Sequence, residues 1–441
     1  AILAADGLQA VALLVVPNPR SVLGAISAEI YGHPADRLRV LGVTGTQGKT
    51  TTSRMIVGAL EAMGATAGVV GTLGTRIAGR DVATALTTPE ATDLQALLAV
   101  MVERGVSDVA VEVSSHALVL GRIDGARCAV AGFTNLGRDH LDFHPTMEEY
   151  FAAKAELFTP ARAARGVVCV DDPYGRRLVE QAQIPITTVA IGAGFAPGRD
   201  YAGSSHPHWQ ASEVVSTAVG TRARISRSDD AVAPFDLRVA LPGAFNLANA
   251  LVAVAICAEA GHDPRQVAEA LGRGTDVPGR LEPIRCGQPF SVLVDYAHKP
   301  DALTAALGTL RPLTQGRLLL VVGAGGDRDS GKRPLMGEIG ARLADVLIVT
   351  DDNPRSEDPA RIRAEVLAGA SGPGSVIEIG DRRLAIREAF AQARPGDIVL
   401  IAGKGHETGQ EVAGVITDFD DRSVAVEELQ AWVSDGSEER A

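Results

Sequence analysis

Residues 38–52 read LRVLGVTGTQGKTTT, an apolar segment that leads into a glycine-rich loop ending at Lys49 and Thr50. The spacing G-x-x-G-x-x-G-K-T from Gly42 fits a phosphate-binding loop, in which backbone N–H groups and the dipole of the following helix favour phosphate. Lys49 can reach the terminal phosphates, and Thr50 can ligate Mg²⁺. A glycine turn with a solvated lysine is the plain alternative, but strand, loop and helix together favour the phosphate site.

Strands and helices alternate on either side of this loop. We expect strands at 38–43, 68–70 and 108–113, and helices at 51–63 and 93–104. Such alternation predicts a parallel sheet with crossover helices. Between 201 and 241, Ser, Thr, Gly and His interleave with β-branched residues, which predicts antiparallel hairpins inserted in or appended to the sheet.

A second α/β run follows a long, alanine-rich helix expected at 246–260. It begins after Pro278-Gly279-Arg280, with strands expected at 290–296, 317–323, 346–350, 376–379 and 397–402. This run predicts a separate doubly wound domain. The opening segment VALLVV, residues 11–16, is expected to form strand and turn.

Composition excludes several classes of protein. The 441 residues carry 42 Lys and Arg against 54 Asp and Glu, a net charge of −12 that argues against general nucleic-acid binding but not against small anions. The apolar stretch at 11–16 is too short to insert in a membrane, and no secretion signal is evident. The 4 cysteines are widely spaced without a CxxC pair, which favours a reduced, cytoplasmic setting.

Single acidic and histidine residues in the first α/β run are ambiguous. Glu112 ends the apolar segment VAVEV, where a P-loop enzyme places a second metal-binding carboxylate, although a strand-end Glu is more often solvated. His116 and His140 are ambiguous as single residues, since a lone histidine is more often a satisfied core or surface group than a ligand. The segment RDHLDFH (138–144) concentrates two histidines and two aspartates. For this segment a metal or phosphate site is about as well supported as a structural role. Lys154, by periodicity, is an ordinary helix lysine.

Four polar clusters follow strands of the second run: DYAHKPD (295–301), GGDRDSGKRP (325–334), DDNPRSEDP (351–359) and GKGHE (403–407). Ligands in open α/β sheets bind beyond the carboxyl ends of the strands. We therefore expect these loops to converge on one crevice.

Taken together, these motifs resemble those of the Mur ligases of peptidoglycan synthesis, in particular the enzymes that extend UDP-N-acetylmuramoyl-L-alanyl-D-glutamate. The resemblance runs from about residue 20 to 432 and includes, in family order, GTQGKTTT, LTTPE, EVSSHAL, NLGRDHLDFH, KAELF, GAFNLANA, PGRLE, DYAHKPD, GDRDSGKRPLM, DDNPR and GKGHE. It implies an α/β protein with a central P-loop ATPase domain, whose parallel sheet carries added antiparallel strands, and a C-terminal Rossmann-like domain. The implied bounds are 1–36 for the remnant of a mostly absent N-terminal UDP-binding domain, 37–277 for the central domain and 278–441 for the amino-acid-binding domain.

The resemblance also assigns roles to individual positions. Lys49, Lys154 and His140 are the implied catalytic residues, with Thr50, Glu112 and His140 supporting Mg²⁺ and Lys154 expected as a carbamate. Gln47 stands where relatives often have Asn. The implied ATP contacts are Gly45, Thr46, Gln47, Gly48, Lys49, Thr50, Thr51, Asn246, Asn249, Arg280, Asp295, Tyr296 and His298, and the implied contacts to the UDP-muramoyl dipeptide are Thr87, Thr88, Ser114 and Arg122.

Amino-acid specificity is expected to rest on Asp352-Asn353-Pro354-Arg355. Diaminopimelate differs from lysine by a carboxylate on its far carbon, and a guanidinium such as that of Arg355 can grip a carboxylate with two parallel hydrogen bonds. The DNPR segment resembles that of the diaminopimelate-adding enzymes. A surface ion pair is the alternative role for Arg355. The remaining implied contacts are Arg328, Gly403 and Glu407, of which Glu407 suits an ammonium group.

The implied reaction is an ATP-dependent amide ligation. ATP would phosphorylate the γ-carboxylate of the D-glutamyl residue, and the amine of meso-diaminopimelate would attack the acyl phosphate. We expect a monomer whose domains close to assemble the site. Three alternatives remain open: a folylpolyglutamate synthetase, against which DDNPR and GKGHE argue; a lysine-adding ligase, from which Arg355 discriminates; and an inactive nucleotide-binding scaffold.

Overall fold

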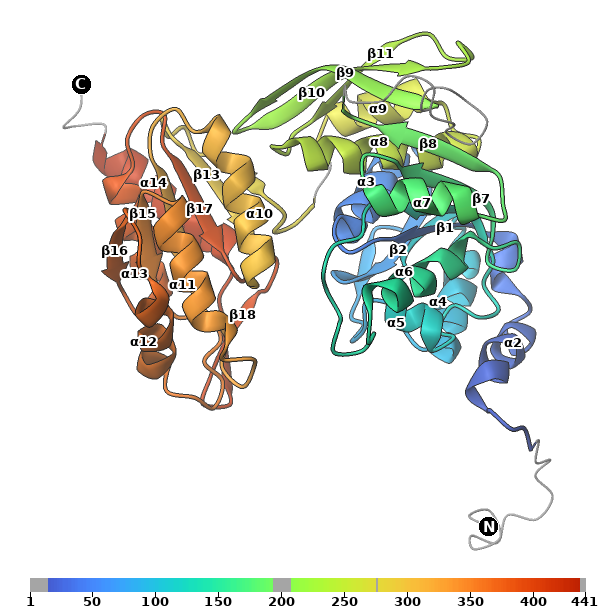
Figure 1. The fold of residues 1–441 in the computed structure, drawn as a ribbon, viewed down its shortest axis with the longest axis horizontal. Coiled ribbons are helices and arrows are strands. Elements are labelled where there is room, and N and C mark those ends of the chain that lie inside the picture. The colour runs from blue at the N-terminus through green and yellow to red at the C-terminus, as the bar shows by residue number, and fades with distance from the viewer. Residues whose placement is uncertain (1–14, 193–207, 275–276, 437–441) are drawn as a thin grey trace, which may run out of the picture.

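The computed structural model describes residues 15–192, 208–274 and 277–436, which form a central domain and a C-terminal domain (Figure 1). The strand-and-turn segment expected at 11–16 falls largely outside the described residues, as do residues 201–207 of the expected hairpin region. The boundary predicted at 277/278 falls between the last helix of the central domain and the first strand of the C-terminal sheet.

The central domain is built on an 11-stranded sheet in the order β11-β10-β9-β8-β7-β6-β1-β5-β2-β3-β4. Its middle strands pair in parallel, as the alternating pattern predicts, and antiparallel hairpins extend both ends. The strands are β1 (Arg39–Thr44), β2 (Ala67–Gly71), β3 (Gly74–Ile77), β4 (Arg80–Val82), β5 (Asp108–Glu112), β6 (Cys128–Phe133), β7 (Ala163–Cys169), β8 (Ile186–Ala190), β9 (Trp209–Thr217), β10 (Gly220–Arg227) and β11 (Phe235–Val239).

Helices cover both faces of this sheet (Figure 1). They are α2 (Arg20–Ile30), α3 (Lys49–Ala62), α4 (Ala91–Glu103), α5 (Ser115–Val119), α6 (Met147–Ala155), α7 (Pro173–Gln181), α8 (Ala244–Glu259) and α9 (Pro264–Gly272), with short 3₁₀ turns η1 (Pro34–Arg37) and η2 (Glu156–Phe158). In β1, Leu41 and Val43 join a cluster with α3, α8 and α9, whereas Val40 joins the opposite cluster with α4. Strands with both faces buried have apolar residues in succession, which explains the continuous run at 40–43.

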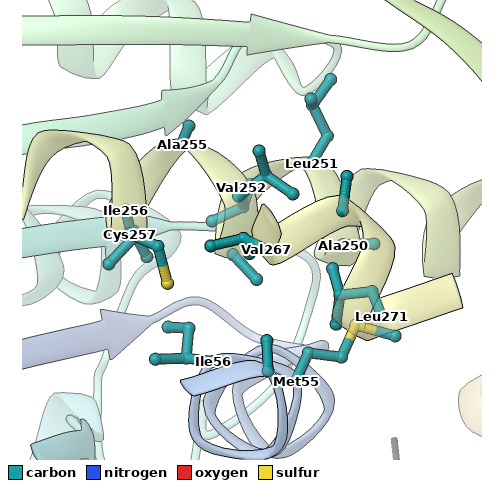
Figure 2. Packing of buried hydrophobic residues seen from close by; sticks show 14 of the residues in the cluster. Met55, Ile56, Ala250, Leu251, Val252, Ala255, Ile256, Cys257, Val267 and Leu271 are labelled. Atoms are coloured by element: carbon teal, nitrogen blue, oxygen red, sulfur yellow. The ribbon is translucent and has the colours of Figure 1, made fainter. Parts of the chain in front are cut away.

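Packing between α3, α8 and α9 fixes the start of α3 against the sheet. Met55 and Ile56 of α3 lie against α8 and α9 residues (Figure 2), and all are at most 3% exposed. The alanine-rich α8 is buried almost throughout its length, including Ile256 and Cys257. Burial of a side chain of this size contributes ~1.5–3 kcal/mol, so this layer gives the loop before α3 a rigid base.

The C-terminal domain has a 6-stranded sheet in the order β12-β13-β17-β14-β15-β16. Its strands are β12 (Glu282–Ile284), β13 (Ser291–Asp295), β14 (Leu318–Val322), β15 (Val346–Val349), β16 (Ser375–Glu378) and β17 (Ile398–Ala402), and all but β12 pair in parallel. The helices are α10 (Pro300–Leu310), α11 (Lys332–Leu343), α12 (Pro359–Gly369), α13 (Arg382–Gln392) and α14 (Asp421–Gly436), with the 3₁₀ turn η3 (Arg311–Leu313). The doubly wound prediction is therefore confirmed.

A separate hairpin, β18 (Gly409–Val412) and β19 (Val415–Asp418), follows β17 in the C-terminal domain. The sequence analysis does not include this hairpin, nor β12 or the β3–β4 hairpin. None of the helices in the described part of the chain has the length and apolar character that crossing a membrane requires.

Candidate active site

The glycine-rich loop joins β1 to α3 and places Lys49 at the first position of that helix. Gly48 before it has a φ of 86°, a conformation that glycine adopts without strain. Lys49 Nζ donates to the carbonyl oxygens of Gly45 at 2.7 Å and Thr46 at 3.0 Å, and burial lowers the pKa of Lys49. Because the first turn of a helix leaves its N–H groups without intrahelical partners, the arrangement suits a phosphate group.

The loop is braced by asparagines from two other elements. The N–H of Gln47 donates to Asn135 Oδ1 at 3.0 Å, and the Asn135 amide donates back to the Gln47 carbonyl at 3.1 Å. Asn249 of α8 lies so close that a Cβ on Gly48 would come within 2.2 Å of its Oδ1. Asn246, one turn earlier, is buried and donates to the Pro242 carbonyl at 2.8 Å. The predicted ATP contact Asn249 thus adjoins the phosphate loop.

Glu112, at the end of β5, meets Thr50 in the interior. Thr50 Oγ1 donates to Glu112 Oε2 at 2.9 Å, and Thr72 Oγ1 donates to the same oxygen at 3.0 Å. A Cβ on Gly71 would lie 2.1 Å from Glu112 Oε1, so that glycine makes room for the carboxylate. A hydroxyl and a carboxylate are hard oxygen donors that fit Mg²⁺, which takes few protein ligands and completes its shell with phosphates and water.

The residues predicted to hold the dipeptide substrate continue from Glu112. Thr88 Oγ1 donates to the Glu112 carbonyl at 2.7 Å and accepts from the Ser114 N–H at 3.2 Å. Thr87 shares a hydrogen bond with Thr72 at 3.1 Å. These hydroxyls therefore form a row beside the candidate metal carboxylate. The hydrogen bond observed for Arg122 is with Glu90 rather than with a residue of that row: its Nε donates to Glu90 Oε1 at 2.9 Å.

His140 lies in a group of aromatic and imidazole rings. Among the described residues, no observed contact joins it to Thr50 or Glu112. Its ring is 4.9 Å from that of His116, which stacks on Phe143 at 4.0 Å. His140 Nε2 is 3.5 Å from Asp139 Oδ2, yet burial outweighs that carboxylate and lowers the pKa of His140 to about 4. His140 is consequently neutral at pH 7 and has a nitrogen lone pair. The described residues contain no cluster of three or more potential His, Cys, Asp or Glu metal ligands.

Arg280, Tyr296 and His298 form a stack at the edge of the C-terminal domain that faces the phosphate loop. The Arg280 guanidinium lies 4.8 Å from the centre of the Tyr296 ring, and the His298 ring lies 4.5 Å from it. Arg280 also contributes to lowering the pKa of Lys49, after burial. Both oxygens of Asp295 accept backbone N–H groups, from Leu281 and Ala297, each at 2.8 Å. Asp295 thereby orders the turn on which this stack is built.

The four polar loops of the C-terminal domain converge as predicted. Asn353 Nδ2 donates to Glu407 Oε2 at 2.8 Å, and the Gly403 N–H donates to the Asp295 carbonyl at 3.1 Å. Asp352 lies beside this pair and is 6% exposed, while Arg328 is exposed to solvent. Amide, carboxylate and guanidinium groups therefore gather at the carboxyl ends of β13, β14, β15 and β17.

Arg355 occupies a strained position within this group. Its φ is 54°, in the left-handed region, and its backbone pairs with the β18–β19 hairpin through Glu411 and Ala413. Its Nη1 donates to the Gly326 carbonyl at 2.7 Å, and its Nε lies 3.6 Å from Glu411 Oε2. The side chain is 25% exposed, so the guanidinium can bind a second anion from the solvent side in addition to the Glu411 carboxylate. Strain of this kind costs ~1–3 kcal/mol and is concentrated at functional sites.

Comparison with known proteins places this arrangement in a family. Residues 43–257 match the Mur ligase middle domain, and residues 279–405 match the Mur ligase glutamate ligase domain. The UDP-N-acetylmuramoyl-L-alanyl-D-glutamate–2,6-diaminopimelate ligase of Streptomyces avermitilis is 49% identical over 426 residues, which cover 95% of this chain and 81% of that protein. The chain belongs to the Mur ligase family.

Solved structures agree with this assignment. A structure of a ligase with the same name superposes with a TM-score of 0.69 at 33% identity, covering 97% of this chain and 86% of the other. Folylpolyglutamate synthase of Mycobacterium tuberculosis, complexed with ADP and AMPPCP, gives a TM-score of 0.64 at 18% identity, covering 86% of this chain and 91% of that one. At that identity the second likeness concerns the fold alone.

In this Mur ligase Lys154 is far from the ordinary helix lysine that its periodicity predicts. Its side chain is 1% exposed, and its Nζ donates to the Gly45 carbonyl at 2.9 Å and lies 4.7 Å from the centre of the Tyr150 ring. Burial, together with the nearby Lys49 cation, lowers the pKa of Lys154 well below its usual value. The interpretation from periodicity was wrong because α6 is covered on the side that carries this lysine.

Several contributors to the ligase site are absent from the sequence analysis. Asn135 braces the phosphate loop, Tyr150 hydrogen-bonds Thr46 at 3.1 Å, and Lys404 lies beneath the amino-acid loops. Asn135 and Lys404 stand inside the motifs NLGRDHLDFH and GKGHE, so a closer reading of polar residues at strand ends could have found them. Tyr150 carries no local signal of its role.

Proposed function

We propose that this Mur ligase joins meso-diaminopimelate to UDP-N-acetylmuramoyl-L-alanyl-D-glutamate in an ATP-dependent reaction. The observation that carries the proposal is the set of opposite charges on adjoining loops: the Arg355 guanidinium and the Glu407 carboxylate, with Asn353 bonded to Glu407 at 2.8 Å. A substrate whose far end carries both a carboxylate and an ammonium group matches that pattern. The relative from S. avermitilis bears the name of this activity.

The nucleotide is held mainly by the central domain. Lys49 and the N–H groups at the start of α3 face the phosphates, and Asn249 lies against the same loop. Thr50 and Glu112 would hold Mg²⁺, which when bound offsets negative charge on the phosphates. The other proposed nucleotide contacts are Gly45, Thr46, Gln47, Gly48, Thr51, Asn246, Arg280, Asp295, Tyr296 and His298.

The muramoyl dipeptide belongs beside the row of hydroxyls formed by Thr87, Thr88 and Ser114, with Arg122 at its far side. From there the D-glutamyl γ-carboxylate can approach the terminal phosphate over Lys49. Transfer of that phosphate breaks its bond to ADP and forms an acyl phosphate. The amine of diaminopimelate then attacks the acyl carbon, and phosphate leaves as the amide forms.

The protein contributes position and charge to these steps rather than a nucleophile. Arg355 holds the distal carboxylate of diaminopimelate, Glu407 holds its ammonium group, and Arg328, Asp352, Pro354 and Gly403 shape the same loops. The reacting amine is thereby directed towards the central domain, and lysine, which lacks the distal carboxylate, leaves Arg355 without its second anion.

Lys154 is proposed to act as a carbamate. Its depressed pKa favours the neutral amine, which can add to CO₂ with loss of one proton. Such a group would present two oxygens next to Gly45, where the unmodified side chain presents an amine. His140, which is neutral at pH 7, is proposed to support the same metal region.

The direct test measures ADP release with UDP-N-acetylmuramoyl-L-alanyl-D-glutamate, Mg-ATP and either meso-diaminopimelate or L-lysine. We expect release that depends on diaminopimelate and falls at least ~100-fold in kcat/KM for Arg355→Ala, since a bidentate charged contact is lost. Preference for lysine would assign the chain to the lysine-adding ligases, and ATP binding without release of ADP would indicate a scaffold.

A further inference from the structure

Lys404 is a fully buried lysine in the loop after β17, and its side chain is 0% exposed. Its ammonium group lies 3.0 Å from Asn353 Oδ1, 3.4 Å from Asp352 Oδ1 and 3.6 Å from Glu407 Oε2. All three neighbours belong to the proposed amino-acid site. Lys404 itself lies beneath them and has no role in the function proposed above.

The hydrogen bonds of Asn353 show what Lys404 does to that site. Asn353 Oδ1 accepts from Lys404 Nζ and from the Glu411 N–H, each at 3.0 Å. Its amide oxygen is therefore held inward by two donors, and its NH₂ group is directed to Glu407 Oε2 at 2.8 Å. A primary amide has its acceptor and its donors on opposite branches. The two donors that fix Asn353 Oδ1 therefore also determine that the NH₂ group of Asn353 donates to Glu407.

Charge balance supports the same assignment. Asp352 and Glu407 are two carboxylates gathered around one ammonium group, and their mutual repulsion would separate them without it. With Lys404 present the three groups sum to one negative charge. A single net negative charge under the loops suits a substrate ammonium group, whereas a net positive charge there would repel it.

The strand ends on either side are held by a second buried cation. Arg382 donates to the carbonyl oxygens of Asp351 at 3.3 Å and Ala402 at 3.0 Å, and pairs with Asp421 at 2.7 Å. Asp351 and Ala402 immediately precede Asp352 and Gly403. The backbone under the site is therefore ordered by Arg382, which leaves Lys404 to orient the side chains.

We propose that Lys404 is a positioning residue for amino-acid recognition, which acts through Asn353 to present Glu407 to the ammonium group of the incoming amino acid. The inference rests on the proposed function, because it names the residue that prepares that same site. Burying an ammonium group costs free energy, and apolar side chains of similar volume commonly replace buried ion pairs without loss of stability. A need for stability alone does not account for a lysine here.

The test compares steady-state kinetics of Lys404→Met with those of the wild type. We expect the KM for diaminopimelate to rise by about tenfold or more, as when a hydrogen bond to a charged group is lost. The KM values for ATP and for the muramoyl dipeptide should stay within about twofold, a split that general damage to the fold would not give. Arg342→Met, an exposed position in α11 of the same domain, is the matched control and should leave all three constants unchanged.

A double-mutant cycle tests the route through Asn353. The KM for diaminopimelate in Lys404→Met/Asn353→Ala should lie close to that of Asn353→Ala alone, because the proposed effect of Lys404 passes through its 3.0 Å hydrogen bond to Asn353 rather than through its longer contacts with Asp352 and Glu407. Independent, additive penalties would overturn the proposal, as would an unchanged KM in Lys404→Met. Thermal melting checks that the variants fold. If Lys404→Met does not, Lys404→Leu, which likewise removes the donor to Asn353, takes its place under the same criteria.

The two levels of inference fail differently. Wild-type protein that releases no ADP with diaminopimelate overturns the proposed function and, with it, the role of Lys404. Wild-type protein that is active, with variants whose KM for diaminopimelate is unchanged, overturns only the role of Lys404. Calorimetric titration of diaminopimelate into wild type and Lys404→Met gives the same comparison without turnover, and equal affinities would contradict the inference.

Discussion

Lys49 and Lys154 donate to the same carbonyl oxygen, that of Gly45, at 2.7 and 2.9 Å. Two ammonium groups on one acceptor repel each other, and burial adds to the cost of charging Lys154. Conversion of Lys154 to a carbamate would replace that repulsion with attraction. The local electrostatics thus favour the modification before any substrate is bound.

This arrangement predicts that activity depends on dissolved CO₂. Protein prepared in CO₂-depleted buffer should lose ADP release, and added bicarbonate should restore it, because the carbamate forms and dissociates reversibly. Lys154→Met should lose activity by at least ~100-fold, comparable with removal of a transition-state contact, and should not respond to bicarbonate. Activity in the wild type that is indifferent to CO₂ depletion would argue for an unmodified lysine.

Two half-buried histidines, His406 and His140, predict an acid-sensitive fold. Burial, followed by the Arg280, Arg422 and Arg54 cations, lowers the pKa of His406 to about 4 from an unfolded value near 6.5. Between pH 6.5 and 4 the unfolded chain binds the proton and the folded chain does not, so the free energy of unfolding falls as the pH falls. His140 contributes with the same sign.

Urea unfolding of His406→Gln at pH 7, 6 and 5 should therefore show a weaker loss of stability on acidification than the wild type. The exposed His33, replaced in the same way, is the control and should leave the slope unchanged. A slope that is identical in wild type and His406→Gln would contradict the assignment.

At the scale of helices, α13 and α14 are joined by several ion pairs, and two of these differ strongly in burial. Arg382 and Asp421 are both 0% exposed and meet at 2.7 Å, whereas Arg387, at 60% exposed, reaches Glu428 from the surface. Burial first lowers the pKa of Arg382, but the Asp421 carboxylate outweighs it, and the pKa is raised overall. The buried pair consequently keeps its charge.

Asp421→Asn should lower the free energy of unfolding by ~3–5 kcal/mol, because it leaves Arg382 charged and without its anion in the interior. Arg387→Ala, between the same two helices, should have a far smaller effect, because solvent screens an exposed pair. Both values follow from urea unfolding at pH 7. Equal effects of the two substitutions would mean that burial does not decide the strength of these pairs.

The larger elements are predictable from sequence because their apolar residues follow one period over a sufficient length. The helix expected at 246–260 is α8 (Ala244–Glu259), and the strand expected at 346–350 is β15 (Val346–Val349). The β18–β19 hairpin carries no such signal, since all of β19 is exposed and no alternation marks it. Its place is determined by pairing between Val412 and Arg355, which lie 57 positions apart along the chain. A local sequence pattern does not report a contact over that separation.

The site residues likewise divide into those that a local sequence pattern predicts and those whose role depends on contacts distant in sequence. The phosphate loop and the polar clusters after β13, β14, β15 and β17 are visible because glycine and charged residues interrupt apolar strands. The burial of Lys154 cannot be predicted from the local sequence, because the elements that cover this lysine are distant in sequence. The fixed orientation of Asn353 likewise depends on Lys404 and Glu411. These residues are separated from Asn353 along the chain by α12, β16, α13 and β17.

At the scale of the whole molecule, the two halves of the proposed reaction lie on different domains. In the described part of the chain few polar contacts join them: Lys299 Nζ lies 3.5 Å from Asp139 Oδ1, and Arg285 donates to the Val219 carbonyl at 3.1 Å, at the β9–β10 turn. Ala218, next to Val219, packs against the core of the C-terminal domain. Figure 1 shows the domains side by side, with α10 near that turn. Contacts this sparse allow the domains to move relative to each other.

We therefore predict closure when the substrates bind. Small-angle scattering with a non-hydrolysable ATP analogue, the muramoyl dipeptide and diaminopimelate should give a smaller radius of gyration than the free protein. ADP alone, which engages mainly the central domain, is the control and should produce less compaction. An unchanged radius with all ligands bound would mean that the active site is assembled without domain movement.

The β18–β19 hairpin has a consequence for protein engineering. Gln410, Glu411 and Ala413 bond to the backbone or side chains of Asp352, Asn353 and Arg355, so residues 351–355 and 409–418 behave as one unit although α12, β16, α13 and β17 separate them in the chain. Exchange of Arg355 alone would leave a loop shaped for another side chain. A designer who wants a ligase for a different amino acid has to transplant both segments as a single cassette.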